Sequence, residues 1–172
     1  EIRRCTPVPG KIGAALKFGE GACVSLGRVP KLPMAGQPLT VMAWVKPDAD
    51  RGVVVARGGA FCGFSLYLLD GVAKFGIHRE QAGPTDIAAG REPVGRDWVH
   101  LAGVVNSDSI ELYVNGKVAA RTKTDGFIPG NAGQGMEIGG DLGNSPVEIT
   151  DSFSGIIDEV KVFLTALGEE EI

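Results

Sequence analysis

The run from Trp98 to Val118 constrains the fold more than any other part of the chain. It holds two stretches dominated by β-branched and aromatic residues, and apolar and polar residues alternate along the second stretch. A polar turn at 106–108 separates the two stretches. Asn115-Gly116 then supplies two residues that tolerate positive φ, the strongest local signal for a β-hairpin. The sequence therefore predicts antiparallel sheet at the centre of the chain.

Strand-length segments separated by turn residues recur along the whole chain, a pattern typical of a β-sandwich. A second hairpin turn is expected at Asp70-Gly71. Helix signals are confined to 167–172, which predicts one short helical turn at the C-terminal end. The sequence thus predicts an all-β fold, a two-sheet antiparallel β-sandwich with one short C-terminal helical turn. The other predicted strands are 13–18, 22–26, 39–45, 52–57, 64–69, 72–78, 85–89, 136–138 and 154–163.

Length and composition exclude several classes of protein. A chain of 172 residues is most simply one domain, with 10–172 as the folded part and 1–9 as a flexible N-terminal segment. The net charge is -4 and the basic residues are scattered, so we expect no nucleic-acid partner. No apolar run approaches the roughly 20 residues of a membrane span, so no membrane insertion is expected. Because neither a signal peptide nor an initiating Met is present, we expect a segment of a longer protein.

The three cysteines, Cys5, Cys23 and Cys62, allow at most one disulfide and leave one thiol over. Their spacings match no zinc motif. We interpret them as small apolar fillers, because free cysteine is among the most buried residue types.

Several short motifs occur in a recognisable order and spacing. Together they resemble the laminin-G-like, concanavalin A-like jelly-roll domains found in many bacterial secreted and surface proteins. The resemblance covers 9–172 and implies a two-sheet jelly roll that serves as a binding module, with glycans or proteins as ligands. It also implies an extracellular or cell-surface location and further domains in a longer parent chain. The motifs that carry it are Gly10–Gly19 (GKIGAALKFG), Leu39–Pro47 (LTVMAWVKP), Trp98–Ala102 (WVHLA), Leu112–Gly116 (LYVNG), Phe153–Val160 (FSGIIDEV) and Ala166–Ile172 (ALGEEEI).

A structural calcium ion is one implication of this resemblance, because related sandwich modules often hold one near the joined chain ends. Asp158 lies in an otherwise apolar strand and needs a partner there. Asp158 together with Glu20 and loop carbonyls would supply the oxygen ligands that calcium prefers. The run Phe18-Gly19-Glu20-Gly21 departs from the family, which commonly has an aspartate directly after the Phe. The alternative is that Asp158 accepts backbone N–H groups from a neighbouring loop.

Two further acidic segments are weaker metal candidates. The run 48–52 lacks the third oxygen ligand and the terminal Glu of an EF-hand loop, so we interpret it as a hairpin turn. Asp141, Asn144 and Asp151 form a second acidic region, which could bind a metal or ligand at a rim or could be a solvated loop.

The strand 72–78 offers the best candidate for ligand contact. Lys74 and His78 share one face of it, beside Tyr67 of the preceding strand. An aromatic ring packs against the apolar face of a sugar, and the polar groups could bind its hydroxyls. The alternative is an ordinary solvent-facing strand. We assign Trp44 and Trp98 to the core.

No catalytic constellation stands out. Sandwich glucanases of the same superfamily carry paired carboxylates on one strand, but no Glu-x-Asp-x-x-Glu stretch exists here. We interpret His100 as a hydrogen-bonded structural histidine rather than a base. We therefore expect a non-catalytic binding module, with carbohydrate as its ligand. The alternatives are a protein–protein adhesion module of the same fold and, less favoured, a polysaccharide hydrolase or lyase.

Overall fold

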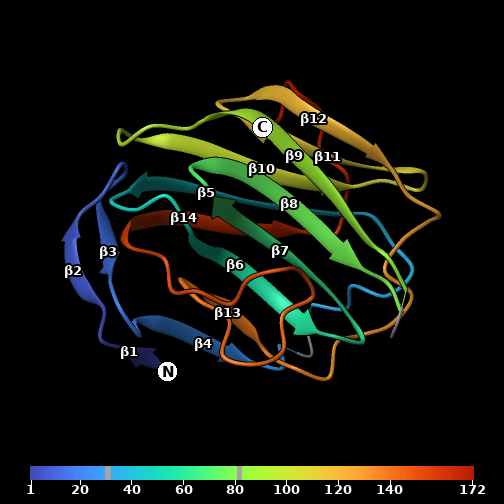
Figure 1. Ribbon diagram of the computed structural model, residues 1–172, viewed down its shortest axis with the longest axis horizontal. Helices are drawn as coiled ribbons and strands as arrows, with labels where there is room; N and C mark the ends of the chain where they lie inside the picture. The colour runs from blue at the N-terminus through green and yellow to red at the C-terminus, as the bar shows by residue number, and fades with distance from the viewer. Residues whose placement is uncertain (30–31, 81–82) are drawn as a thin grey trace.

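The computed structural model describes residues 1–29, 32–80 and 83–172, which form two antiparallel seven-stranded sheets packed face to face (Figure 1). We call them sheet A and sheet B. In spatial order, sheet A comprises β1 (Ile2–Arg3), β4 (Cys23–Gly27), β13 (Met136–Ile138), β6 (Gly52–Gly59), β7 (Cys62–Leu69), β8 (Val72–His78) and β9 (Thr85–Pro93). Sheet B comprises β12 (Lys117–Lys123), β11 (Ser109–Val114), β10 (Val99–Val105), β5 (Leu39–Pro47), β14 (Gly155–Phe163), β3 (Ala14–Phe18) and β2 (Thr6–Pro9).

Both predicted two-residue hairpin turns are confirmed. Asn115 and Gly116 have φ values of 52° and 77° and join β11 to β12. Asp70 and Gly71 have φ values of 56° and 77° and join β7 to β8. Positive φ at both central residues gives the turn a twist that matches the right-handed twist of the strands. Local sequence therefore sets these two pairings.

Residues 1–9 are part of the sandwich and not a separate flexible segment. Ile2 and Arg3 pair with β4 in sheet A, and residues 6–9 pair with β3 in sheet B. The chain changes sheet at Arg4, which has a φ of 52°. The residue pattern does not predict this pairing, because proline is a poor strand residue except at a sheet edge. Pro7 and Pro9 are tolerated here because β2 is the edge of sheet B.

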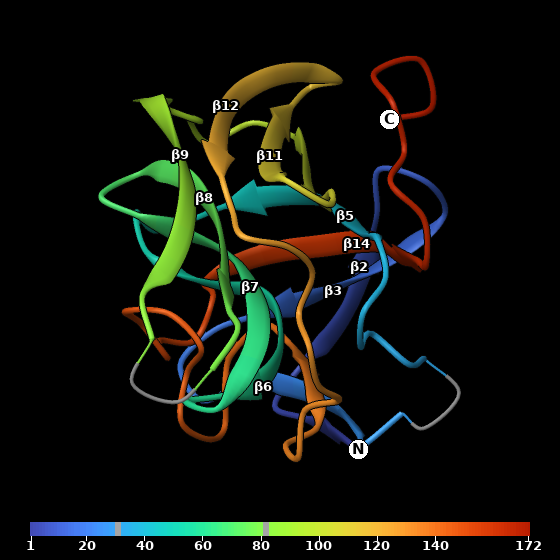
Figure 2. The ribbon, with the colours of Figure 1, turned by 90° about the vertical axis from the view of Figure 1, so that its right-hand side faces the viewer.

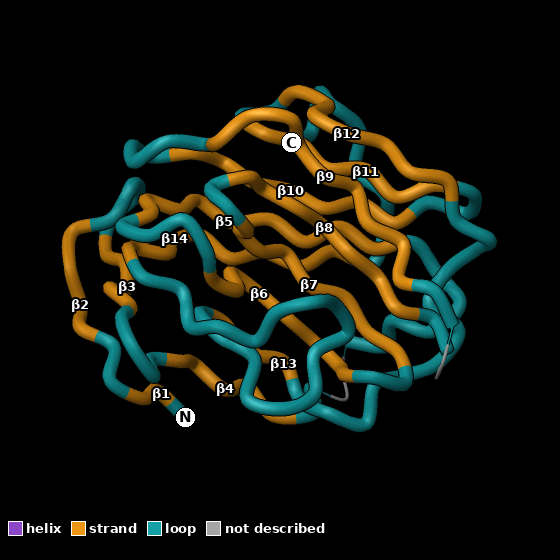
Figure 3. Tube along the Cα trace, viewed as in Figure 1, coloured by secondary structure: helices purple, strands orange, loops and turns teal. Residues whose placement is uncertain are grey.

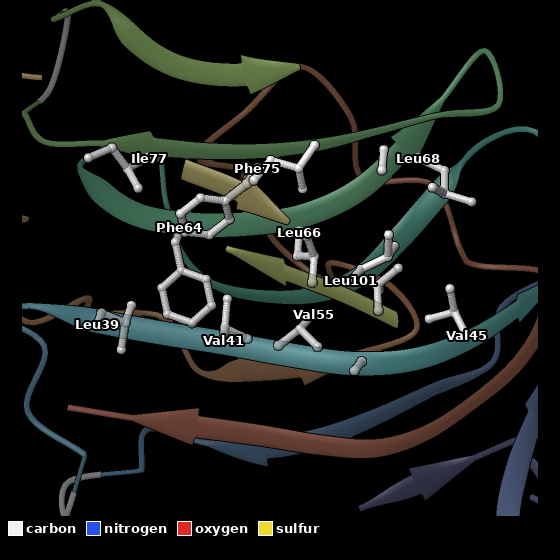
Figure 4. Packing of buried hydrophobic residues seen from close by; sticks show 14 of the residues in the cluster. Leu39, Val41, Val45, Val55, Phe64, Leu66, Leu68, Phe75, Ile77 and Leu101 are labelled. Carbon is white, nitrogen blue, oxygen red and sulfur yellow. The ribbon is translucent and has the colours of Figure 1, made fainter. Parts of the chain in front are cut away.

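The core fills the space between the sheets, as Figure 4 shows from close by. Alternate residues of β5, including Leu39 and Val41, face aromatic and aliphatic side chains of sheet A such as Phe64 and Phe75. The sheets approach closely at Gly103, where a Cβ atom would overlap the ring of Phe75. A glycine is therefore required at this point of β10 by packing and not by backbone conformation.

Each sheet is also covered on its outer face. Figures 1 and 3 show the loop between β13 and β14, residues 139–154, crossing in front of β6. In Figure 2, the C-terminal tail lies on the opposite side of the molecule, against sheet B. The tail ends in one turn, in which the N–H groups of Glu171 and Ile172 donate to Gly168 O. This is the expected helical turn, too short to form a helix, and the described residues contain no helix at all. Accordingly, no helix within the described ranges could span a membrane.

Candidate functional site

The outer face of sheet A holds two of the three side chains predicted to contact a ligand. Tyr67 and Lys74 lie on adjacent strands, and both bind Glu148 of the covering loop. The Tyr67 hydroxyl donates to Glu148 Oε1 over 3.1 Å, and Lys74 Nζ lies 2.9 Å from the same oxygen. The Lys74 ammonium, followed by the Tyr67 hydroxyl, lowers the pKa of Glu148. The structure therefore unites Tyr67 and Lys74 around a carboxylate that the sequence analysis had not connected with them.

The prediction of a solvent-facing position is wrong for Tyr67 and His78, whereas Lys74 is partly exposed. Tyr67 has no exposed surface, because Val53, Ala56 and Ile149 enclose its ring. His78 is buried as well, and its Nδ1 lies 3.2 Å from Thr85 Oγ1 instead of joining the Tyr67 group. With the loop in this position, a sugar ring cannot reach the face of Tyr67.

The same loop buries a pair of carboxylates. Glu137 and Asp141 are each only 7% exposed, and burial raises the pKa of both. Asp141 Oδ1 accepts the N–H of Gly143, whereas its Oδ2 has no hydrogen-bond partner in the described structure. Buried beneath the loop, the pair is not placed as the open acid and base of a glycosidase would be.

Asp158 lies in sheet B and both of its carboxylate oxygens bind backbone. Oδ2 accepts the N–H of Ile12, and Oδ1 accepts the N–H of Glu159. The turn between β2 and β3 packs so closely that a Cβ at Gly10 would overlap Oδ2. The alternative interpretation of Asp158, a backbone acceptor, is therefore the one confirmed.

Glu20 and Asp158 do not converge on one cation. Phe18 on β3 pairs with Gly155 on β14. Asp158 lies three residues further along β14, which is roughly 10 Å from this pair at about 3.3 Å per residue. Glu20 lies beyond Phe18 and away from Asp158. Calcium ligands lie only about 2.3–2.6 Å from the ion, so in this structure Glu20 and Asp158 are too far apart to share one.

Other candidates from the sequence have structural roles. Asp50 in the 48–52 turn pairs with Arg96, and Asp151 pairs with Arg51. The three cysteines are unpaired, and Cys23 is fully buried, as expected of a filler. Among the described residues, no group of three or more His, Cys, Asp or Glu side chains is placed to hold a metal ion.

The outer face of sheet B carries an aromatic site that the sequence analysis missed. Trp44 and His100 are paired across β5 and β10, and their ring centroids lie 5.1 Å apart at an interplanar angle of 50°. Trp44 is half-buried and not part of the core, because its neighbours Ala43 and Val45 point inward instead. The exposed Lys11 places its Nζ 4.6 Å from the centroid of the Trp44 ring.

A hollow of about 240 Å³ opens beside this pair, and its lining comprises Trp44, His100, Asn115, Gly116 and Ile172. The hairpin turn is fixed there because Asn115 Oδ1 accepts the N–H of His100 and Asn115 N donates to His100 O. Burial, followed by the charge of Lys161, lowers the pKa of His100. The imidazole is therefore neutral at pH 7 and offers one donor and one acceptor.

This hollow combines an aromatic face with a small number of polar groups, the usual make-up of a small-molecule site. The sequence contained the signal for it. Alternation along β5 places Val41, Ala43 and Val45 inward and hence Trp44 outward. The interpretation of Trp44 as core followed residue type instead of that alternation.

Two antiparallel seven-stranded sheets packed face to face make this protein a β-sandwich. A laminin G-type family model, described as the concanavalin A-like lectin/glucanases superfamily, matches residues 18–172. The chain belongs to this family, as its motifs had indicated. A comparison with curated proteins found no match.

Solved structures agree with this fold. Domain 4 of AbnA, an extracellular arabinanase of Geobacillus stearothermophilus in complex with arabinotriose, matches with a TM-score of 0.75 and 20% identity over 98% of this chain and 79% of that one. The receptor-binding domain of botulinum neurotoxin D gives 0.72 and 12%, over 99% and 45%. Mouse laminin α1 domains LG4-5 give 0.69 and 16%, over 86% and 40%. The chain thus spans less than half of the last two, and all three matches establish the fold alone.

Proposed function

We propose that this chain is a non-catalytic, carbohydrate-binding module of a larger extracellular or cell-surface protein. It binds a sugar unit in the hollow beside Trp44. The observation that carries the proposal is the half-buried indole next to a neutral imidazole, with Asn115 at the rim of the same hollow. An indole face packs against the C–H face of a sugar, and the imidazole and amide bind its hydroxyls.

The size of the hollow indicates how much of a glycan it holds. At about 240 Å³ it is smaller than the roughly 300–1,000 Å³ of sites that enclose drug-sized ligands. It therefore suits one sugar unit of a chain. The Lys11 ammonium rests on the indole, and because cation–π contacts at exposed sites contribute only about 0.5–1 kcal/mol, a sugar displaces it at little cost.

Two observations support a binding role over catalysis. The buried carboxylate pair Glu137 and Asp141 is covered by the 139–154 loop and does not line the hollow beside Trp44. The structural neighbours include an arabinanase domain in complex with arabinotriose and a botulinum neurotoxin D domain in complex with N-acetylneuraminic acid. Arabinotriose and N-acetylneuraminic acid are ligands of those proteins. For this chain they make glycans the first class of ligand to test.

The experiment is a glycan array with the wild-type chain, followed by calorimetry on the best hit. Trp44→Ala should weaken binding at least about tenfold, equivalent to about 1.4 kcal/mol. Tyr67→Phe is the control, because Tyr67 is buried beneath the loop and should leave affinity unchanged. Equal affinity of wild type and Trp44→Ala would refute the site. Absence of binding to any glycan would refute carbohydrate recognition and favour the adhesion module.

A further inference from the structure

The loop over sheet A encloses negative charge that no basic group balances. Glu137 and Asp141 are each more than nine-tenths buried, and neither takes part in any ion pair among the described residues. Glu137 lies on the outer face of β13, because Met136 beside it is part of the core, and Asp141 follows four positions later in the covering loop. Two like charges withdrawn from water without a partner are strongly destabilising.

A third buried oxygen lies on the same face of sheet A. Glu137, Ala56 and Ser65 are register neighbours on β13, β6 and β7, so they form a row across the outer face of sheet A. Ser65 is completely buried, and its Oγ has no hydrogen-bond partner in the described structure. Ala56, between Glu137 and Ser65, carries no polar side-chain atom that could bond to either of them.

The loop brings Asp141 over this row. Gly139 N donates to Val54 O of β6, and Asp141 N donates to Thr150 O of the returning strand of the loop. Ile149 packs on Ala56 in the same layer. The unpartnered Asp141 Oδ2 and Ser65 Oγ therefore both lie in the layer between sheet and loop, together with the Glu137 carboxylate.

We propose that Glu137, Asp141 and Ser65 hold a calcium ion between sheet A and the 139–154 loop, with backbone carbonyls or water as its remaining ligands. Two carboxylates and a hydroxyl are hard oxygen donors of the kind calcium takes. The ion balances the buried charge and pins the loop onto the sheet. This site differs from the one first expected at Asp158, whose oxygens both bind backbone N–H groups. It is also independent of carbohydrate binding at Trp44.

The test measures the thermal stability of the chain after chelator treatment, with and without added CaCl₂, and the stoichiometry by calorimetry. The wild type should bind one ion. At calcium about 100-fold above Kd, its Tm should rise by roughly 5–10 °C. Asp141→Asn and Glu137→Gln should each weaken calcium binding at least about tenfold. The matched control is Asp151→Asn, an exposed carboxylate of the same loop that pairs with Arg51, and it should keep the wild-type response.

Three results would overturn the proposal. The first is a wild-type Tm unaffected by calcium. The second is a wild-type response retained by both Asp141→Asn and Glu137→Gln while Asp158→Asn loses it, which would return the site to Asp158. The third is stabilisation by acid alone, which would mean that the two carboxyl groups share a proton. If one of the two variants fails to fold, the other still tests whether calcium binds at this site, because the two substitutions lie on different segments.

Discussion

The bond between Tyr67 and Glu148 provides the sharpest test of how the loop is attached to sheet A. Glu148→Ala removes the only acceptor bonded to the buried Tyr67 hydroxyl among the described residues, and it also removes the partner of Lys74. Tyr67→Phe removes the hydroxyl itself and leaves Glu148 bound to Lys74. The two substitutions therefore form a double-mutant cycle around one hydrogen bond.

The magnitude follows from burial. Leaving the Tyr67 hydroxyl without an acceptor costs about 1–3 kcal/mol, because Tyr67 has no exposed surface. The ion pair of Lys74 adds at most about 1 kcal/mol, since the two side chains are 21% and 43% exposed. Glu148→Ala should thus cost about 2–4 kcal/mol alone but about 1 kcal/mol in the Tyr67→Phe background. The expected coupling, which is the difference between these two costs, is about 1–3 kcal/mol.

Urea denaturation of the four proteins measures the coupling. Hydrogen exchange at the Val53 amide, which donates from β6 to Asp151 O of the loop, reports detachment of the loop. Glu148→Gln is the matched control, because it keeps an acceptor for Tyr67 and should lose less than about 1 kcal/mol. The coupling should persist at neutral pH. The coupling should disappear as the pH falls below 4.5, because the Glu148 carboxylate becomes protonated as the pH passes its lowered folded-state pKa. Free energies that add within about 0.5 kcal/mol would refute the account of the loop as bound through Tyr67.

Three further predictions concern other parts of the sandwich. Gly103→Ala should destabilise the chain by about 1–3 kcal/mol through overlap with Phe75, whereas Gly19→Ala, with no atom near the added methyl, should change stability by less than about 0.5 kcal/mol; equal effects in thermal melts would contradict the packing. Asp158→Ala should cost about 1.5–3 kcal/mol and speed hydrogen exchange at Ile12, and an unchanged exchange rate there would argue against the anchor. Because the folded-state pKa of His100 lies below 6.5, its contribution to stability is complete above pH 6.5 and is lost as the pH falls; His100→Gln should flatten the decline between pH 7 and 5.5, and a parallel decline in both proteins would exclude this cause.

The sequence determined the strands and their turns, because both depend on residues close in the chain. Alternation fixes which side chains share a face of a strand, and the Asn115-Gly116 and Asp70-Gly71 pairs fix turns that match the twist of the strands. Family motifs then indicated how the strands assemble. The same alternation predicts that Trp44 points outward, although tryptophan as a residue type favours the core.

Tertiary structure alone decided which faces remain accessible. The Tyr67 face is polar and outward by pattern, yet Glu148, 81 positions later, returns across it and bonds to the hydroxyl. The sequence predicts Asp158 as a metal ligand. In the structure its Oδ2 accepts the N–H of Ile12, which lies 146 positions earlier in the chain. Periodicity describes a strand and its two faces, whereas the cover over a face comes from a distant segment whose path depends on the assembled sandwich. For that reason the sequence alone predicts the two-sheet architecture. Which surface is open to a ligand, the Tyr67 face or the Trp44 hollow, follows only from the tertiary structure.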